Sequence, residues 1–200
     1  TKYQKKYVKE YDLQGEQQVR FYYEVTPEKA NNAFLRAKVK NMTDLPWLEG
    51  EAQMFLENEF MGKAAMPFTP PGKDQELVLG TESRIIARKE LVRKYEETAG
   101  VLGGKRRITY SYKITIENQL PRKESLIVTD AFPVSRNEKI KLDIENISMP
   151  FAKDEEFEKS TGYIQGIRRW MLAMDPHSTK VITYEVVITF DKEIRIWGLR

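Results

Sequence analysis

Few residues in this sequence could carry out covalent chemistry. It contains no cysteine and one histidine, His177. The lack of cysteine excludes disulfides, thiol nucleophiles, iron–sulfur clusters and cysteine-ligated zinc. A single imidazole excludes a site built from several histidines and leaves room for one Ser–His–Asp triad. We therefore expect no cofactor and no resident metal.

The segment Asp130–Asn137 (DAFPVSRN) gathers the most varied polar groups. It places a carboxylate, a hydroxyl, a guanidinium and an amide around a proline bend. Asp, Asn and Ser commonly bond backbone N–H groups at turns, and proline fixes φ, so we favour a structural role for the segment. The candidate interaction or structural residues are Asp130, Pro133, Ser135, Arg136 and Asn137.

Two catalytic arrangements can be weighed against this pattern. Ser135 lacks the Gly-x-Ser-x-Gly surround of a nucleophile elbow, and His177 follows Asp175–Pro176 in an expected turn. A glycosidase needs two carboxyl groups with different pKa values held across a cleft, whereas the acidic run Glu155–Glu158 lies on one expected loop. The same run lacks the spacing of a known calcium-binding loop. We therefore assign no catalytic residue and predict that the chain is not an enzyme.

The charge balance is nearly even. The sequence has 33 Lys and Arg against 30 Asp and Glu, a formal net charge of +3. Lys105–Arg107 and Arg168–Arg169 are short basic groups near aromatic residues, but the chain has no large basic excess, so we do not expect nucleic-acid binding. No apolar run approaches the roughly 20 residues that a membrane-spanning helix needs.

Alternating apolar residues dominate the rest of the chain. Side chains leave opposite faces of a strand, so this period of two predicts strands with one face in a core and one in water. The stretches that alternate are 19–25, 35–39, 108–116, 140–144 and 182–190. Ile85–Glu97 (IIARKELVRKYEE) alternates less clearly, and we predict a strand with a charged tail. Asn58–Glu59 is the expected tip of a hairpin.

These strands, with turn residues between them, predict an all-β fold with minor helical content. We expect two immunoglobulin-like antiparallel β-sandwich units, since each half has the usual size of such a unit. The glycine-rich stretch Ala99–Lys105 divides them into residues 1–103 and 104–200. We expect Trp170 to be buried and the stretch Pro150–Gly166 to be a long functional or mobile loop.

Several phrases of the sequence together resemble a known family. They are Phe55–Gly62 (FLENEFMG), Pro70–Gly72 (PPG), Asp130–Asn137 and the ending Val181–Leu199. The chain resembles the C-terminal domain of the mucoidy-inhibitor (MuiA-like) family, a domain of unknown function. One departure is Leu45–Gly50, which reads LPWLEG where the family has a Leu-Pro-Gly turn. The resemblance implies that the chain is the C-terminal part of a longer, coiled-coil-containing protein, and it carries over no catalytic residue.

Together these observations predict a non-catalytic interaction or scaffolding module of a bacterial cell-envelope protein, periplasmic or at the cell surface. We expect a protein partner or self-association, because exposed sheet edges can pair with another chain. Carbohydrate stays open as a partner. The alternative is a carboxylate-based hydrolase or carbohydrate-binding domain that uses a cleft between the two units.

Overall fold

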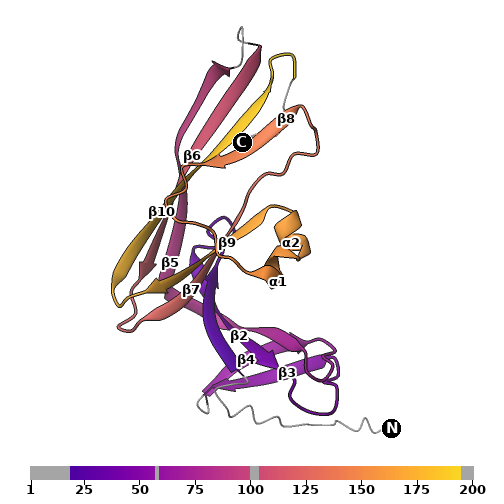
Figure 1. The fold of residues 1–200 in the computed structure, drawn as a ribbon. Helices are drawn as coiled ribbons and strands as arrows, with labels where there is room; N and C mark the ends of the chain where they lie inside the picture. The colour runs from indigo at the N-terminus through magenta and orange to yellow at the C-terminus, as the bar shows by residue number, and fades with distance from the viewer. Residues whose placement is uncertain (1–18, 57–58, 100–103, 195–200) are drawn as a thin grey trace, which may run out of the picture. The chain divides into compact units, whose positions relative to one another are not determined.

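The computed structural model describes residues 19–56, 59–99 and 104–194, and these residues form mainly strands (Figure 1). The all-β prediction is therefore confirmed, and the two helices have only four residues each. The strands are β1 (Val19–Val25), β2 (Asn32–Lys40), β3 (Gly50–Leu56), β4 (Glu59–Met66), β5 (Asp74–Ala99), β6 (Lys105–Asn118), β7 (Glu124–Ala131), β8 (Ile140–Glu145), β9 (Ile167–Met174) and β10 (Ser178–Asp191). The helices are α1 (Glu155–Glu158) and α2 (Thr161–Ile164).

The chain forms two compact units. Unit 1 takes in Thr1–Phe21 and Arg36–Gly80, and unit 2 takes in Tyr22–Leu35 and Thr81–Arg200. The predicted division between residues 103 and 104 would pass between β5 and β6, which pair antiparallel as far as Ala99 and Lys105. That division and the immunoglobulin-like description stay predictions.

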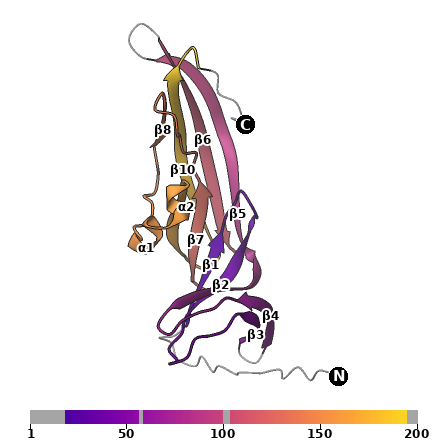
Figure 2. The same cartoon turned by 90° about the vertical axis from the view of Figure 1, so that its right-hand side faces the viewer.

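Eight strands form one sheet in the order β8-β10-β6-β5-β2-β1-β7-β9. The pairing of β1 with β7 is parallel, and those of β6 with β5 and β10 are antiparallel. Figure 2 shows β8, β10, β6 and β5 side by side. The sequence alternation sets which side chains face the core: Ile114 pairs with Ile182 and both are fully buried, whereas Thr183, one residue on, is exposed.

The charged segment Ile85–Glu97 is part of β5, as predicted. Ion pairs across the strands explain how so charged a segment stays extended. The pairs between β5 and β6 are Arg88 with Glu117, Glu90 with Lys113, Glu96 with Arg106 and Glu97 with Arg107. The register shifts between Leu91 and Arg93, which changes the face that the following side chains use.

The core of unit 2 lies between the two ends of the sheet, which curls over. The indole ring of Trp170 on β9 stacks on the ring of Tyr184 on β10, with centroids 6.0 Å apart, although these strands are not paired with each other. Trp170 is fully buried, which confirms the prediction for it. Lys180 on β10 also donates from Nζ to the carbonyl oxygen of Ala173 on β9, at 2.8 Å.

A strap between β8 and α1 bridges the same two strands. The N–H of Ser148 donates to the carbonyl oxygen of Thr183 on β10 at 2.9 Å. Four residues later, the N–H of Ala152 donates to the carbonyl oxygen of Arg169 on β9 at 2.8 Å. Between these bonds, Met149 accepts a bond from the Trp170 indole N–H and packs against the core. The strap therefore covers backbone groups that an open sheet edge would expose.

The predicted loop Pro150–Gly166 contains both helices, which lie next to β9 (Figure 1). Two arginines of β9 hold them. The guanidinium carbon of Arg168 lies 3.8 Å from the centroid of the Tyr163 ring, and that of Arg169 lies 3.8 Å from the centroid of the Phe157 ring. The excursion is therefore a packed part of unit 2.

Unit 1 contains the hairpin of β3 and β4, whose pairing runs from Gly50 and Met66 to Leu56 and Glu59. The expected tip at Asn58–Glu59 falls partly on residues 57–58, which lie outside the described residues. Elsewhere in this unit, the buried side chain of Asn41 donates to the carbonyl oxygens of Leu45 and Thr69, so it joins two loops.

Gly166 is required where the chain leaves α2. Its φ is +92°, and it accepts a backbone bond from Phe132, so the two segments touch. A Cβ atom built at Gly166 would lie 2.1 Å from the carbonyl oxygen of Phe132, which is backbone and cannot turn aside. Only glycine avoids both the strained φ and this clash.

We predict that Gly166→Ala lowers the free energy of unfolding by about 2–4 kcal/mol, the sum of φ strain and displaced backbone. Gly72→Ala is the matched control, because its φ is +75° but nothing lies within 4 Å of the added Cβ. Urea denaturation would measure both. Equal losses in the two variants would show that the contact with Phe132 is not tight.

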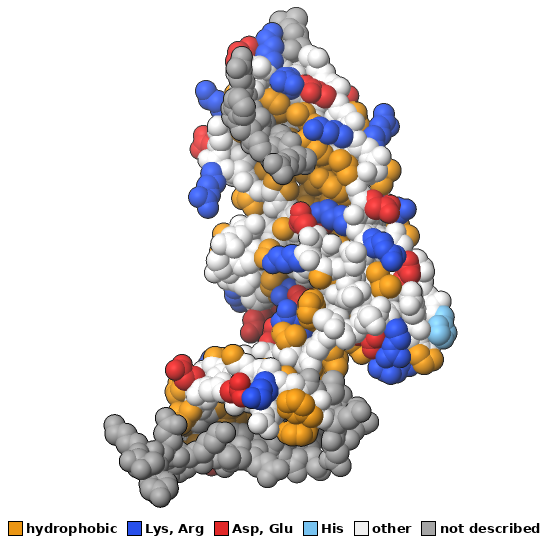
Figure 3. Space-filling view, turned by 180° about the vertical axis from the view of Figure 1, so that it is seen from behind, with side chains coloured by type: hydrophobic (Ala, Val, Ile, Leu, Met, Phe, Trp, Pro, Cys, Tyr) orange, Lys and Arg blue, Asp and Glu red, His pale blue; other side chains and the backbone are white. Residues whose placement is uncertain are grey.

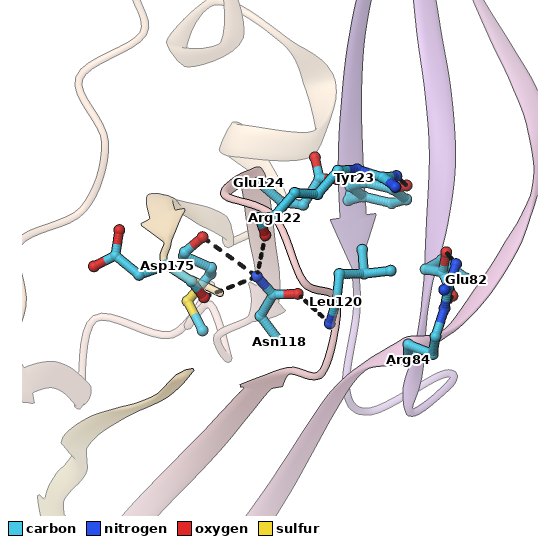
Figure 4. A network of polar contacts seen from close by, with 9 residues as sticks. Tyr23, Glu82, Arg84, Asn118, Leu120, Arg122, Glu124 and Asp175 are labelled. Carbon is cyan, nitrogen blue, oxygen red and sulfur yellow. Dashed lines mark hydrogen bonds and ion pairs between the residues drawn. The ribbon is translucent and has the colours of Figure 1, made fainter. Parts of the chain in front are cut away.

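Asn118, at the end of β6, joins the β6–β7 turn to the β9–β10 turn (Figure 4). Its buried amide nitrogen contacts the carbonyl oxygens of Arg122, Met174 and Asp175 at 3.0, 3.3 and 2.9 Å. Its amide oxygen accepts from the N–H of Leu120 at 3.0 Å. Only a group with both a donor and an acceptor satisfies these partners.

We predict that Asn118→Asp lowers the free energy of unfolding by about 2–4 kcal/mol, because a carboxylate cannot donate to three carbonyl oxygens. Asn32→Asp is the control, since that side chain is exposed at the start of β2. Thermal or urea denaturation at neutral pH measures the difference. If Asn118→Asp is as stable as Asn32→Asp, the amide does not hold the two turns together.

Candidate functional site

Asp130 is the predicted site residue that the structure places most deeply. It lies near the end of β7 and its exposed fraction is 0%. Val128 and Leu126, two and four residues earlier, are buried too, so the strand alternation aims all three side chains into the core. A carboxylate there must be paired or hydrogen-bonded, because burying an unpaired charge costs several kcal/mol.

Two side chains and one backbone group meet that need. Lys89 of β5 places its Nζ 2.9 Å from Oδ1 of Asp130. The hydroxyl of Tyr184 on β10 donates to Oδ2, at 2.5 Å. The N–H of Ala131 donates to Oδ1, at 2.9 Å. We call Asp130, Lys89 and Tyr184 the buried trio; it draws on three strands far apart in the sequence.

Aromatic rings surround the trio. The ring of Tyr112 on β6 stacks on that of Tyr184, with centroids 5.4 Å apart, and Lys89 Nζ lies 4.8 Å from the centroid of the Tyr112 ring. Burial, and then the charge of Asp130, raise the pKa of Tyr184 far above its ordinary value. Burial chiefly raises the pKa of Tyr112 as well. Both phenols therefore stay protonated at neutral pH, and the Tyr184 hydroxyl acts as a donor to Asp130.

The trio lies at a nearly closed position. The Lys89 side chain is 14% exposed, and its nearest second carboxylate is the exposed Glu28, at 4.0 Å. A carboxylate, an amine and a phenol could move protons on a substrate in an open site. Here the carboxylate of Asp130 already accepts three donors from the chain itself. The arrangement therefore fits an internal link between strands better than a site for a substrate.

The other predicted residues of the segment lie on the surface. Pro133, Ser135, Arg136 and Asn137 line an open hollow of about 390 Å³, together with side chains of β8 and β10. Its floor is apolar, formed by Ile140, Leu142 and Ile188. Asp130 does not line this hollow. The structure therefore brings four of the five predicted residues together and separates the fifth from them.

Within the hollow, two of the polar side chains serve the local turn. The Ser135 hydroxyl donates to the carbonyl oxygen of Asn137 at 2.9 Å and accepts from the Asn137 N–H at 3.1 Å. The Asn137 amide oxygen accepts from the N–H of Lys139. Arg136 is exposed at the rim. These contacts support the structural role that the sequence favours for the segment.

A Ser135–His177 pair is excluded because the two residues lie near opposite ends of β10. Ser135 lies in the hollow with Ile188, whereas His177 immediately precedes Ser178, at the other end of the strand. Ten residues of extended strand separate those positions, about 33 Å. His177 is exposed, and its φ of 48° belongs to the turn between β9 and β10. It is the turn histidine that the sequence predicts.

The basic candidates have partners within the domain. Arg106 and Arg107 pair with glutamates of β5, and Arg168 and Arg169 stack on the helices. Figure 3 shows blue and red side chains interspersed on the face that it draws.

In the part of the chain that the structure describes, no three acidic or histidine side chains gather to hold a metal ion. Nor do the described residues include a helix long and apolar enough to cross a membrane.

The sequence did not single out Lys89, Tyr184 or Tyr112. Lys89 stands at a position of β5 where its neighbours Ala87 and Ile85, two and four residues back, face the core. A lysine on the same strand face as buried apolar residues is the signal that could have identified Lys89. Tyr184 and Tyr112 have the sequence pattern of ordinary core residues. Nothing in that pattern indicates that Tyr184 bonds to Asp130, 54 residues away.

We predict that stability falls as pH rises above about 10, the ordinary tyrosine pKa. The unfolded chain then releases the Tyr184 proton while the folded chain, with a raised pKa, keeps it, so unfolding is favoured by up to about 1.4 kcal/mol per pH unit. Tyr184→Phe removes this contribution. Urea denaturation between pH 8 and 11 tests the point, and equal slopes for both proteins would contradict it.

Comparisons with known proteins give a family but no activity. The chain is 24% identical over 136 residues to "Protein F37C4.5" of Caenorhabditis elegans, an alignment that takes in 68% of this chain. The chain spans about a quarter of the length of that curated relative, 24%. No solved structure matches. A family model matches residues 3–192, and the chain therefore belongs to the family described as Domain of unknown function (DUF4139).

Proposed function

We propose that this domain is a non-catalytic interaction module that binds a protein partner through exposed apolar side chains of unit 1. The polar groups that could do chemistry support this proposal, because they bind one another. Asp130 is enclosed by its donors, Ser135 and Asn137 complete a turn, and Arg168 and Arg169 hold the helices. A carboxylate-based hydrolase would instead need two carboxyl groups that a substrate can reach.

The observation that carries the proposal is where the exposed apolar side chains lie. Among the described residues, fourteen large apolar side chains are exposed, and eight of them belong to unit 1, although that unit supplies the smaller share of those residues. They are Phe21, Met42, Leu45, Leu48, Phe55, Phe60, Phe68 and Val78. Concentrations of exposed apolar surface commonly mark protein contacts.

The hairpin of unit 1 adds a second route to binding. The rings of Phe55 and Phe60 lie 5.5 Å apart across β3 and β4, and both are more than half exposed. Over the residues that the structure describes, the two strands form a sheet of their own, so the outer edge of each has backbone groups that can accept a further strand. Rigid aromatic side chains beside such an edge are typical of interface anchors.

The mucoidy-inhibitor resemblance extends the proposal to the parent protein. A coiled coil in the longer chain would bring copies of the domain together, so that several weak contacts act at once. In this proposal the domain is a scaffolding part of a cell-envelope protein, and its partner is another protein or a second copy.

Site-specific photo-cross-linking of the full-length parent in its own cells tests the proposal. A photoreactive amino acid at Leu48 or Phe60 should give adducts with another protein chain, because an apolar anchor is buried on binding. Ile164 is the matched control: it is apolar and 70% exposed, but lies in unit 2. The absence of adducts at both unit 1 positions, or equal adducts at Ile164, would refute the assignment of the surface to unit 1.

A further inference from the structure

The Lys89–Asp130 pair differs from the other ion pairs of this domain. Most of those pairs are substantially exposed, as in Arg88 with Glu117, where the exposed fractions are 50% and 31%. Lys89 and Asp130 have exposed fractions of 14% and 0%, and the amine nitrogen lies 2.9 Å from a carboxyl oxygen. An amine and a carboxyl group are thus held together where little water can separate them or hydrolyse their product.

We propose that Lys89 and Asp130 condense in the folded domain to form an amide, an intramolecular isopeptide bond between β5 and β7. A proton first passes from the ammonium to the carboxylate, which gives an amine with a free lone pair and a carboxylic acid. The nitrogen Nζ of Lys89 then attacks Cγ of Asp130. An N–C bond forms and a C–O bond breaks.

The reaction balances without any other reactant. The ammonium of Lys89 has three hydrogens and the amide nitrogen keeps one. The two others leave with one carboxyl oxygen of Asp130 as a water molecule. No electron is gained or lost, so no oxidant, reductant or cofactor takes part.

Neighbouring groups are placed to assist each step. The hydroxyl of Tyr184 and the N–H of Ala131 donate to the two carboxyl oxygens, where negative charge develops when the nitrogen attacks. The raised pKa of Tyr184 keeps its hydroxyl protonated for this role. The carboxylate of Glu28, 4.0 Å from Nζ, can accept the proton that the attacking nitrogen loses.

The product would fasten the curled sheet. Strands β5 and β7 are not neighbours, because β2 and β1 lie between them in the sheet order. A covalent link between Lys89 and Asp130, which are 41 residues apart, closes a loop in the unfolded chain. Such a loop reduces the conformational entropy of the unfolded state, as a disulfide does, in a sequence that contains no cysteine.

Intact mass spectrometry of the purified, folded chain under denaturing conditions tests the bond. We expect a mass lower than that of the sequence by one water molecule. Trypsin should not cut after Lys89, and a branched peptide should join the segments around Lys89 and Asp130. A folded protein, as judged by circular dichroism, with the unmodified mass would overturn the proposal.

Variants separate the bond from an ordinary ion pair. Lys89→Arg keeps the positive charge but lacks the nucleophilic amine, so it should show its full sequence mass. Asp130→Asn should still condense, with loss of ammonia instead of water. Lys113→Arg is the control, because Lys113 also pairs with a glutamate but is 41% exposed, and it should keep the loss of one water. Loss of water in Lys89→Arg would place the modification elsewhere and refute the assignment.

Discussion

The fold of unit 2 depends on one constraint: the carboxylate of Asp130 is buried completely and must be satisfied from within the chain. Lys89 and Tyr184 meet that need from β5 and β10, on the other half of the sheet. The sheet can satisfy them together only if its two halves face each other. Two further contacts stabilise the curled sheet. The rings of Trp170 and Tyr184 stack on each other, and the strap through Ser148 and Ala152 bonds to both β10 and β9.

The same constraint bears on function. A polar group that is needed to hold strands together is poorly placed to act on a substrate. Any motion that separates it from its partners leaves a charge unpaired in an apolar core. The apolar side chains outside the core are not under this restriction. We therefore relate the polar interior of unit 2 to stability, and the exposed apolar surface of unit 1 to recognition. In this account the two units divide the work between them.

Much of the secondary structure could be predicted from the sequence, because alternation is a local property. It gave the strands around Ile114 and Tyr184, and cross-strand ion pairs explain why even Ile85–Glu97 is extended. The order of strands in the sheet could not be predicted, since the same alternation suits many pairings. The four-residue helices were missed because each is held by capping groups and by arginines of β9 rather than by its own periodicity.

The candidate site was predicted in part for similar reasons. Ser135 and Asn137 bond within their own turn, so their role is readable from five residues of sequence. The partners of Asp130 lie 41 and 54 residues away, and only the curl of the sheet brings them together. Gly166 was not singled out either, since its need for a positive φ comes from the crossing at Phe132.

The central claim is that Asp130 and Lys89 act as one energetic unit inside the curled sheet. A double-mutant cycle on the free energy of unfolding tests it most directly, with Asp130→Leu, Lys89→Met and the double variant. Each single change leaves one buried group without its partner, whereas the double change replaces the pair by apolar side chains of similar size. We predict a double variant that is at least as stable as either single variant, with a coupling of about 2 kcal/mol or more. Additive losses within about 0.5 kcal/mol would contradict the account.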